Sequence, residues 1–318
     1  MKRSLTLGYV PLVDAAGLIA AQSQGFFADE GLEVTLSREA SWATIRDKVA
    51  VGALDGAHVL APMVIAQTLG VGSDATPMIA PVTLACDASA ITLSRRLGLD
   101  DARPAAALAE RVAARRTMDA SPLTFSSVFP YSTHNYLLRL WLSEAGVDPD
   151  RDVRLTIAPP PRMPELLASG IIEGFCAGEP WNSVAVAAGS GVLAARACDI
   201  APGAPDKVLG LTEAWSRRHP ETLAALIRAV VRGLRWTADP DHHDQLAEVL
   251  SQPHCLGVPR AMVAGGLAIA RFDEGRPTHD QAAWLLDQMR RWGQVQGPGP
   301  DAEAVYRPDL FDQAWAKA

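Results

Sequence analysis

The sequence predicts an α/β protein of two lobes, each a mostly parallel sheet flanked by helices, with a ligand cleft between them. The chain has 318 residues, of which 48% are hydrophobic and 20% charged, enough for two ordinary globular cores. Residues 50–62 also resemble residues 168–180: an alanine, two glycines and a final proline coincide, and Asp55 corresponds to Glu173. Such internal similarity indicates that one structural unit occurs twice.

The segments before the two copies follow the same order. Each copy itself reads as the end of a helix, a glycine turn and a short buried strand that stops at proline. The preceding strand, helix and strand are expected at 5–10, 18–27 and 31–36 in the first unit, and at 123–129, 135–144 and 146–155 in the second. This alternation is typical of a mostly parallel sheet covered by helices.

The two units divide the chain into lobes. We expect residues 1–92 together with 206–318 to form the first lobe, and residues 93–205 the second. Beyond about residue 213 the sequence predicts helices that pack around the first lobe. These helices are expected over 221–236, 244–250, 260–269 and 279–292.

Composition and motifs argue against several functional classes. A net charge of −7 does not favour broad nucleic-acid binding. The four cysteines are widely spaced and form no metal-ligand pattern, although four would also allow two disulfides. The sequence contains no GxSxG, HExxH, GxxxxGK[ST] or strand-linked GxGxxG motif. We therefore expect neither an enzyme nor a bound metal or cofactor.

The first residues bear on localisation. Met1-Lys2-Arg3 leads directly into a strand-length apolar run that ends at Pro11, without the longer apolar segment of a signal peptide. No apolar run approaches the roughly 20 residues that span a membrane. We expect a cytoplasmic protein; the alternative is a periplasmic protein whose leader has been removed.

Candidate ligand-binding residues follow from the strand-end loops, where open α/β sheets bind ligands. Trp42 follows Ser41 at a predicted helix start, and its indole offers one N–H donor and no acceptor, which suits an anion. His134 lies in the first turn of another predicted helix. Lys207, on a predicted strand returning to the first lobe, is a compact positive charge. The alternatives are a packing tryptophan, a structural histidine and an exposed lysine.

Glu179 and Trp181 close the second copy of the repeat. Because a carboxylate would repel an anion, we expect Glu179 to orient Trp181 or to hold the lobes in register.

Six collinear segments, about two thirds of the chain, resemble the nitrate- and bicarbonate-binding proteins of bacterial ABC importers, most closely the cytoplasmic nitrate/nitrite sensors of the NasS type. The segments are 8–16, 40–48, 54–63, 129–139, 178–182 and 206–215. The resemblance implies a periplasmic-binding-protein-like (type II) fold with an oxyanion between the lobes. It assigns ligand contacts to Trp42, His134 and Lys207, with His58 and Ser132 as neighbours. The expected ligand-binding set is Trp42, His58, Ser89, Ser132, His134, Glu179, Trp181 and Lys207.

One loop departs from the relatives. It reads Cys86-Asp87-Ala88-Ser89, where relatives are usually rich in Asn, Gly or Gln. We expect Asp87 to bind backbone groups rather than face the anion.

The resemblance also implies a partner. Sensors of this type hold an RNA-binding antiterminator of the NasT type and release it when nitrate or nitrite binds. The alternatives are the solute-binding component of a nitrate, bicarbonate or sulfonate importer and, more remotely, an enzyme like the pyrimidine-precursor synthases. Those synthases need a cysteine-rich segment that this sequence lacks.

Overall fold

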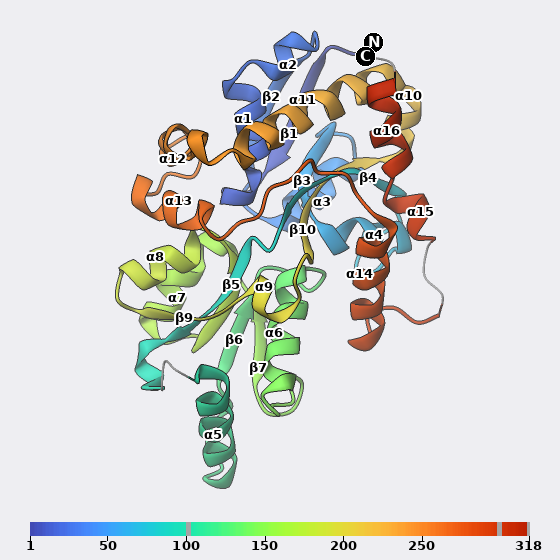
Figure 1. The fold of residues 1–318 in the computed structure, drawn as a ribbon. Coiled ribbons are helices and arrows are strands. Elements are labelled where there is room, and N and C mark those ends of the chain that lie inside the picture. Colours follow the sequence, from blue (N-terminus) through green and yellow to red (C-terminus); the bar gives the residue numbers. More distant parts are fainter. Residues whose placement is uncertain (100–102, 298–300, 317–318) are drawn as a thin grey trace.

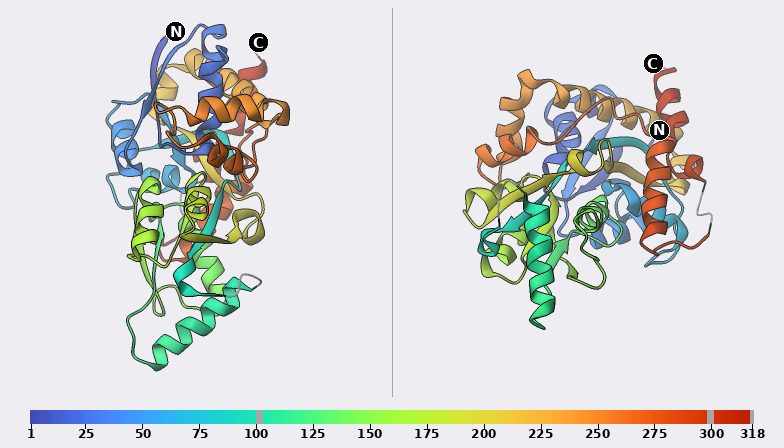
Figure 2. Two further views of the ribbon diagram at one scale, coloured as in Figure 1. Left: turned by 90° about the vertical axis from the view of Figure 1, so that its left-hand side faces the viewer. Right: turned by 60° about the horizontal axis from the view of Figure 1, so that its bottom comes forward.

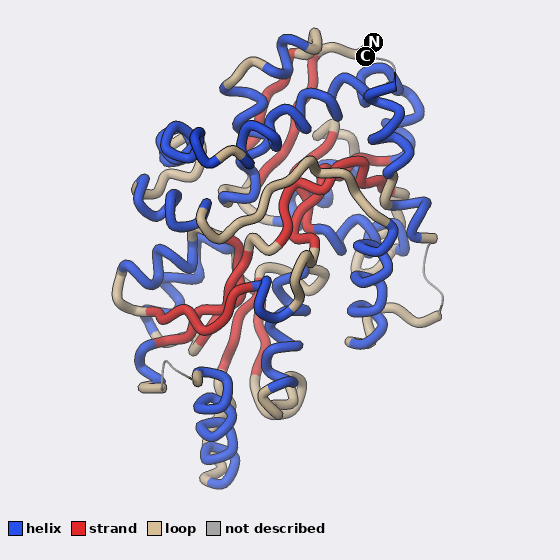
Figure 3. The backbone as a smooth tube through the Cα atoms, in the orientation of Figure 1, coloured by secondary structure: helices blue, strands red, loops and turns tan. Residues whose placement is uncertain are grey.

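The structure contains two five-stranded sheets, each flanked by helices, one above the other in Figures 1 and 3. It is a computed structural model that describes residues 1–99, 103–297 and 301–316. We call each sheet with its helices a lobe. The predicted α/β class with two lobes is confirmed.

The first sheet has the strand order β2-β1-β3-β10-β4. β1 pairs in parallel with β2 and β3, whereas β10 runs antiparallel to β3 and β4. The strands are β1 (Ser4–Tyr9), β2 (Glu33–Arg38), β3 (Gly56–Leu60), β4 (Met78–Cys86) and β10 (Pro205–Thr212).

The second sheet repeats this arrangement in the order β7-β6-β8-β5-β9. β6 pairs in parallel with β7 and β8, and β5 runs antiparallel to β8 and β9. The strands are β5 (Ser89–Ser94), β6 (Thr124–Ser127), β7 (Arg154–Ile157), β8 (Gly174–Gly178) and β9 (Gly191–Arg196). The two similar segments, 50–62 and 168–180, contain β3 and β8. These strands hold equivalent places in the two sheets, so the predicted duplication is confirmed.

Helices flank both sheets. Those of the first lobe begin with α1 (Ala16–Ser23), α2 (Phe26–Asp29), α3 (Trp42–Ala50) and α4 (Ala61–Leu69). The second lobe carries α5 (Pro104–Thr117), α6 (Thr133–Glu144), α7 (Met163–Ser169), α8 (Trp181–Ala187) and α9 (Ala197–Ile200). Figure 2 shows α5 projecting away from the rest of its lobe.

The C-terminal part of the described chain is helical, and its helices at 220–238, 243–251, 260–267 and 279–291 lie where the sequence predicts them. The C-terminal helices are α10 (Glu213–Arg218), α11 (Pro220–Ala238), α12 (His243–Ser251), α13 (Arg260–Leu267), α14 (His279–Arg291), α15 (Ala302–Val305) and α16 (Pro308–Ala316). α11 packs on α1 so closely that a methyl group on Gly233 would lie 2.2 Å from the Gly17 carbonyl oxygen. α13 also contacts α8, so this part of the C-terminal segment reaches the second lobe. Of the helices in the described ranges, none is both long and apolar enough to cross a membrane.

Two strand connections join the lobes. The chain enters the second sheet between Cys86 and Ser89 and returns between Arg196 and Pro205. Asp87 accepts hydrogen bonds from the Gly203 backbone N–H, which confirms that it binds backbone groups. The expected boundary between residues 92 and 93 falls inside β5; we propose that the lobes divide at these two connections.

The lobes also touch at both edges of the gap between the sheets. At one edge the Val13 N–H donates to the Glu179 carbonyl oxygen at 2.8 Å. At the other the Tyr136 hydroxyl donates to Gln294 at 2.7 Å. The two-lobed molecule is therefore in a closed arrangement.

Candidate ligand-binding site

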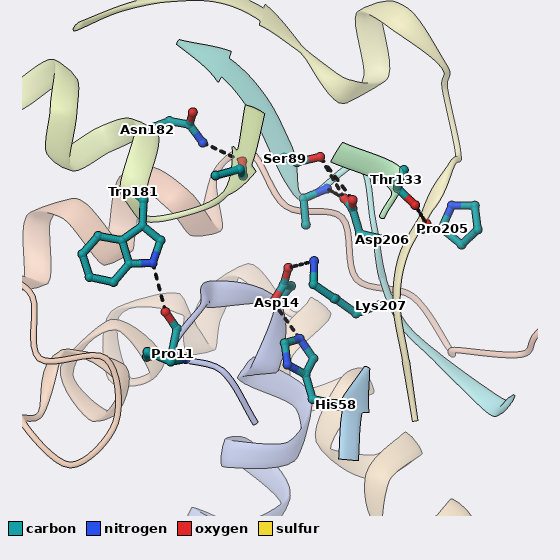
Figure 4. Close-up of polar contacts among 12 residues, drawn as sticks. Pro11, Asp14, His58, Ser89, Thr133, Trp181, Asn182, Pro205, Asp206 and Lys207 are labelled. Carbon is teal, nitrogen blue, oxygen red and sulfur yellow. Dashed lines mark hydrogen bonds and ion pairs between the residues drawn. The ribbon is translucent and has the colours of Figure 1, made fainter. Parts of the chain in front are cut away.

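Asp14 lies at the centre of a buried polar cluster between the sheets (Figure 4). It belongs to a short 3-10 turn, η1 (Val13–Ala15), that follows β1. Its Oδ1 lies 2.8 Å from Nε2 of His58, and its Oδ2 lies 2.7 Å from Nζ of Lys207. All three side chains are fully buried.

Strand pairing brings His58 and Lys207 together. β10 runs antiparallel to β3, with Lys207 opposite Leu60 and Leu209 opposite His58. Residues two apart on a strand share a face, so both side chains project from the same face of the first sheet. Asp14 then reaches them from the end of the neighbouring strand β1, as Figure 4 shows.

The charges of this cluster depend on burial and on one another. Burial alone would raise the pKa of Asp14, but Lys207 and His58 outweigh it and hold this pKa well below its usual range. Burial lowers the pKa of His58, although Asp14 partly opposes the shift. The cluster therefore contains an ionised Asp14 and a neutral His58 at neutral pH.

Lys207 keeps donors for another acceptor. Its ammonium is close enough to Asp14 for an ion pair, but the two groups are not aligned as a hydrogen bond. The same ammonium lies 5.5 Å from the centre of the Trp42 ring. A buried lysine without hydrogen bonds is costly unless a further acceptor is present.

Trp42 begins α3, as the sequence predicts. The Ser41 hydroxyl caps this helix by accepting from the Thr44 N–H at 3.2 Å. The Trp42 ring is buried and lies 5.4 Å from the His58 ring, centre to centre. Its indole N–H has no hydrogen-bond partner in the described part of the chain.

His134 comes from the second lobe, at the second position of α6. Ser132 caps that helix by accepting from the Asn135 N–H, and its own hydroxyl donates to the Phe129 carbonyl. His134 is fully buried, and neither ring nitrogen has a partner among the described residues. Burial, and then the charge of Lys207, lower its pKa well below the usual value, so this imidazole is neutral.

Gly178 brings the two lobes together at this point. A methyl group on Gly178 would lie 3.1 Å from Oδ2 of Asp14 and 3.6 Å from Nε2 of His134. The glycine thus lies beside polar atoms of both lobes, where a side chain would crowd Asp14.

The remaining predicted residues lie nearby, but most of their polar atoms are already engaged. Ser89 donates to Asp206, and the Trp181 indole donates to the Pro11 carbonyl across the lobes at 3.1 Å. The Glu179 carboxylate accepts from the Ser183 N–H, and burial raises its pKa. The Glu179 main-chain carbonyl, rather than the carboxylate, reaches the other lobe at Val13.

Sequence reasoning missed Asp14 and Gly178 as site residues. Asp14 follows β1 and Gly178 ends β8, at strand ends where ligand contacts are expected, but a carboxylate repels an anion and a glycine offers no side chain. A signal was present in the position of Asp14, directly after the first strand. Within the described ranges, no group of three or more His, Cys, Asp or Glu side chains could hold a metal ion.

Comparisons with known proteins agree with this architecture. The chain is 35% identical to the nitrate import ATP-binding protein NrtC of Synechocystis over 98% of its own length, and it spans about half the length of that relative. It is 29% identical to the nitrate/nitrite binding protein NrtA of Synechococcus elongatus, over 99% of this chain and 78% of the other.

A solved structure is similar over nearly the whole chain. The periplasmic nitrate-binding protein NrtA from Synechocystis superposes with a TM-score of 0.88 at 27% identity, covering 99% of this chain and 88% of that one. The model of the NMT1-like family matches residues 1–251. The chain therefore belongs to the NMT1-like family.

Proposed function

We propose that the protein is a solute receptor of the ABC-importer type that binds a small monovalent oxyanion, nitrate or nitrite, between its lobes. The observation that carries this proposal is a set of buried nitrogen atoms around Asp14 that have no hydrogen-bond partner within the described ranges. They belong to Trp42, His58, His134 and Lys207, and come from both lobes.

The chemistry of these groups suits such an anion. Nitrate and nitrite accept hydrogen bonds and donate none, so they can satisfy indole, imidazole and ammonium N–H groups together. Because the donors belong to both lobes, an anion among them stabilises the closed arrangement relative to an open one. No nucleophile in this cluster has a base arranged to activate it, so we propose a binding protein rather than an enzyme.

The names of relatives support the same proposal. NrtA of Synechococcus elongatus is a nitrate/nitrite binding protein, and the similar Synechocystis structure is a periplasmic nitrate-binding protein. We therefore propose a nitrate import system, with its membrane and ATP-binding components, as the partner.

Isothermal calorimetry and thermal unfolding with nitrate, nitrite, bicarbonate and an alkanesulfonate test the ligand. We expect nitrate or nitrite to release or absorb heat with one-site stoichiometry and to raise the melting temperature as its concentration increases. Stabilisation by bicarbonate or the sulfonate, with neither nitrogen anion effective, would overturn the proposal.

A second candidate is the cytoplasmic nitrate/nitrite sensor that controls a NasT-type antiterminator. This candidate rests on the resemblance described in the sequence analysis. The chain is also 35% identical to an ATP-binding import protein and 29% identical to NrtA. Sequences similar to this chain thus occur within ATP-binding import proteins as well as in separate solute-binding proteins. In this case we propose a cytoplasmic location, and for the importer receptor a periplasmic one.

Size-exclusion chromatography with a purified NasT-type antiterminator separates the two candidates. A sensor forms a complex without nitrate that dissociates when nitrate is added. An importer receptor elutes separately under both conditions.

A further inference from the structure

The buried cluster around Asp14 has no net charge. Asp14 and Lys207 form an ion pair, and the neutral His58 and His134 complete the set. A further carboxyl group, that of Asp206 on β10, interacts electrostatically with Lys207 and Asp14. The carboxyl group of Glu179 lies just beyond the end of β8. Asp206 binds the Ala88 N–H and the Ser89 hydroxyl, and Glu179 binds the Ser183 N–H.

A monovalent anion added to this cluster would leave one negative charge uncompensated. The side chains of Asp14, His58, His134 and Lys207 are fully buried, so water cannot screen that charge. An unpaired charge in such surroundings costs several kcal/mol. The positive charge of Lys207 does not remove this cost, because Asp14 has already neutralised it.

His134 is the group placed to supply the missing charge. A neutral imidazole has one N–H donor and one acceptor nitrogen, and both nitrogens of His134 lack partners in the part of the chain that the structure describes. Among the described residues, Nδ1 of His58 also lacks a partner, but its Nε2 is already engaged by Asp14, whereas both nitrogens of His134 are available to an anion. An anion that only accepts hydrogen bonds cannot bond to the acceptor nitrogen of a neutral His134. Protonation converts that nitrogen into a second N–H donor.

We infer that Asp14 makes the site accept a monovalent anion only together with one proton, and that His134 takes up this proton. This inference rests on the proposed function. Asp14 is thus the residue that determines which charge the site accepts. A divalent anion such as sulfate would need a second proton and is rejected.

The direction of the pH dependence follows from linkage. Without ligand, burial and Lys207 hold the pKa of His134 well below its usual value. The bound anion raises that pKa, so a proton is taken up at any pH between the two values. Affinity falls by up to about tenfold for each pH unit of rise within this window, and is constant below it. Nitrate is the anion of a strong acid and does not itself titrate in this range, so the pH dependence of the affinity reflects the protein alone.

Calorimetry of nitrate binding in buffers of different ionisation enthalpy, from about pH 6 to pH 9, measures the proton count directly. We expect the wild type to take up as much as one proton per anion. In Asp14→Asn, Lys207 is no longer neutralised, so we expect uptake near zero and an affinity that does not vary with pH. We also expect this variant to discriminate less between nitrate and sulfate.

Asp206→Asn is the matched control, because burial raises the pKa of Asp206 to about 6 and this carboxyl could also take up the proton. Uptake that persists in Asp206→Asn supports His134 as the carrier; uptake that disappears there assigns the proton to Asp206 and overturns our inference. Nitrate binding by the wild type without proton uptake at every pH overturns it as well. If the wild type binds no nitrate at any pH, the proposed function fails instead, and the inference with it.

Histidine-ring ¹⁵N NMR gives an answer that depends on no variant. The chain has seven histidines, so the His134 signals can be assigned. We expect both His134 nitrogens to carry protons with nitrate bound and only one without it. Unchanged His134 signals in the nitrate complex would contradict the inference.

Discussion

Trp42 and Lys207 offer donors to the same buried space, but they differ as subjects for mutation. Lys207 is fully buried beside Asp14, so its removal leaves an uncompensated carboxylate and destabilises the whole protein. Trp42 is buried too, but its ring packs among apolar neighbours and only its N–H lacks a partner. Replacing the indole by another aromatic ring therefore tests its contribution to nitrate affinity separately from its contribution to folding stability.

Trp42→Phe should weaken nitrate binding by roughly tenfold to a hundredfold, because a hydrogen bond to a charged group contributes about 1.5–3 kcal/mol. We expect a smaller loss of stability, since most of the packing is kept. Calorimetry gives the affinity, and urea unfolding gives the stability. Trp236→Phe is the control, because that ring stacks on His242 in the first lobe. Equal affinities for Trp42→Phe and Trp236→Phe would show that the indole N–H does not contact the anion.

At the scale of elements, the segment that follows α14 joins the lobes opposite the Val13–Glu179 contact. α14 packs on α4 of the first lobe, and the residues after it contact α6 of the second. Gln294 accepts from the Tyr136 hydroxyl at 2.7 Å and donates to the Pro130 carbonyl at 2.9 Å. These bonds hold α6, which carries His134, against the first lobe, so they favour the closed arrangement.

Gln294→Ala should raise the dissociation constant for nitrate by roughly threefold to tenfold. Two hydrogen bonds between the lobes are lost, at about 0.5–1.5 kcal/mol each, and part of this loss shifts the molecule towards an open state. Small-angle X-ray scattering without ligand should show a larger radius of gyration than in the wild type. Gln252→Ala is the control, because the Gln252 side chain donates to Glu248, within one turn of the same lobe. Similar affinities for both variants would contradict a closing role for this segment.

The elements show how far sequence reasoning reaches. The strands β1, β3, β6 and β8 and the helices α3, α6 and α14 were predictable because each has a local signal in turn, cap or apolar pattern. The places of β4, β5 and β9 were not expected, because their apolar runs find partners far along the chain. Trp42, His134 and Lys207 were proposed because strand ends converge. Asp14 was missed because its partner Lys207 lies 193 positions away and the ion pair exists only in the folded chain.

For the whole molecule, the two connections between the lobes are hydrogen-bonded to one another through Asp87 and Gly203, and the buried carboxylate of Asp206 lies beside them. The Asp206 carboxylate, at the start of β10, accepts from the Ala88 N–H of the other connection at 2.6 Å and from the Ser89 hydroxyl at the start of β5. Burial raises the pKa of Asp206 from 3.8 to about 6, against the opposite effect of Lys207. A carboxyl group with a raised pKa favours folding while it is protonated, and this contribution is lost as the pH rises from about 4 to about 6.

Asp206→Asn should therefore become more stable relative to the wild type as the pH rises through this window. An asparagine can keep an acceptor for the Ala88 N–H and donate to Ser89, but it does not ionise. The rise in pKa corresponds to at most about 3 kcal/mol at neutral pH, and the difference should be near its minimum at about pH 4. Urea unfolding from about pH 4 to pH 8 measures it, with the exposed Asp150→Asn as control. A stability difference between Asp206→Asn and the wild type that does not change with pH would show that Asp206 does not ionise in this window. The two connections between the lobes would then have no ionised carboxylate buried beside them.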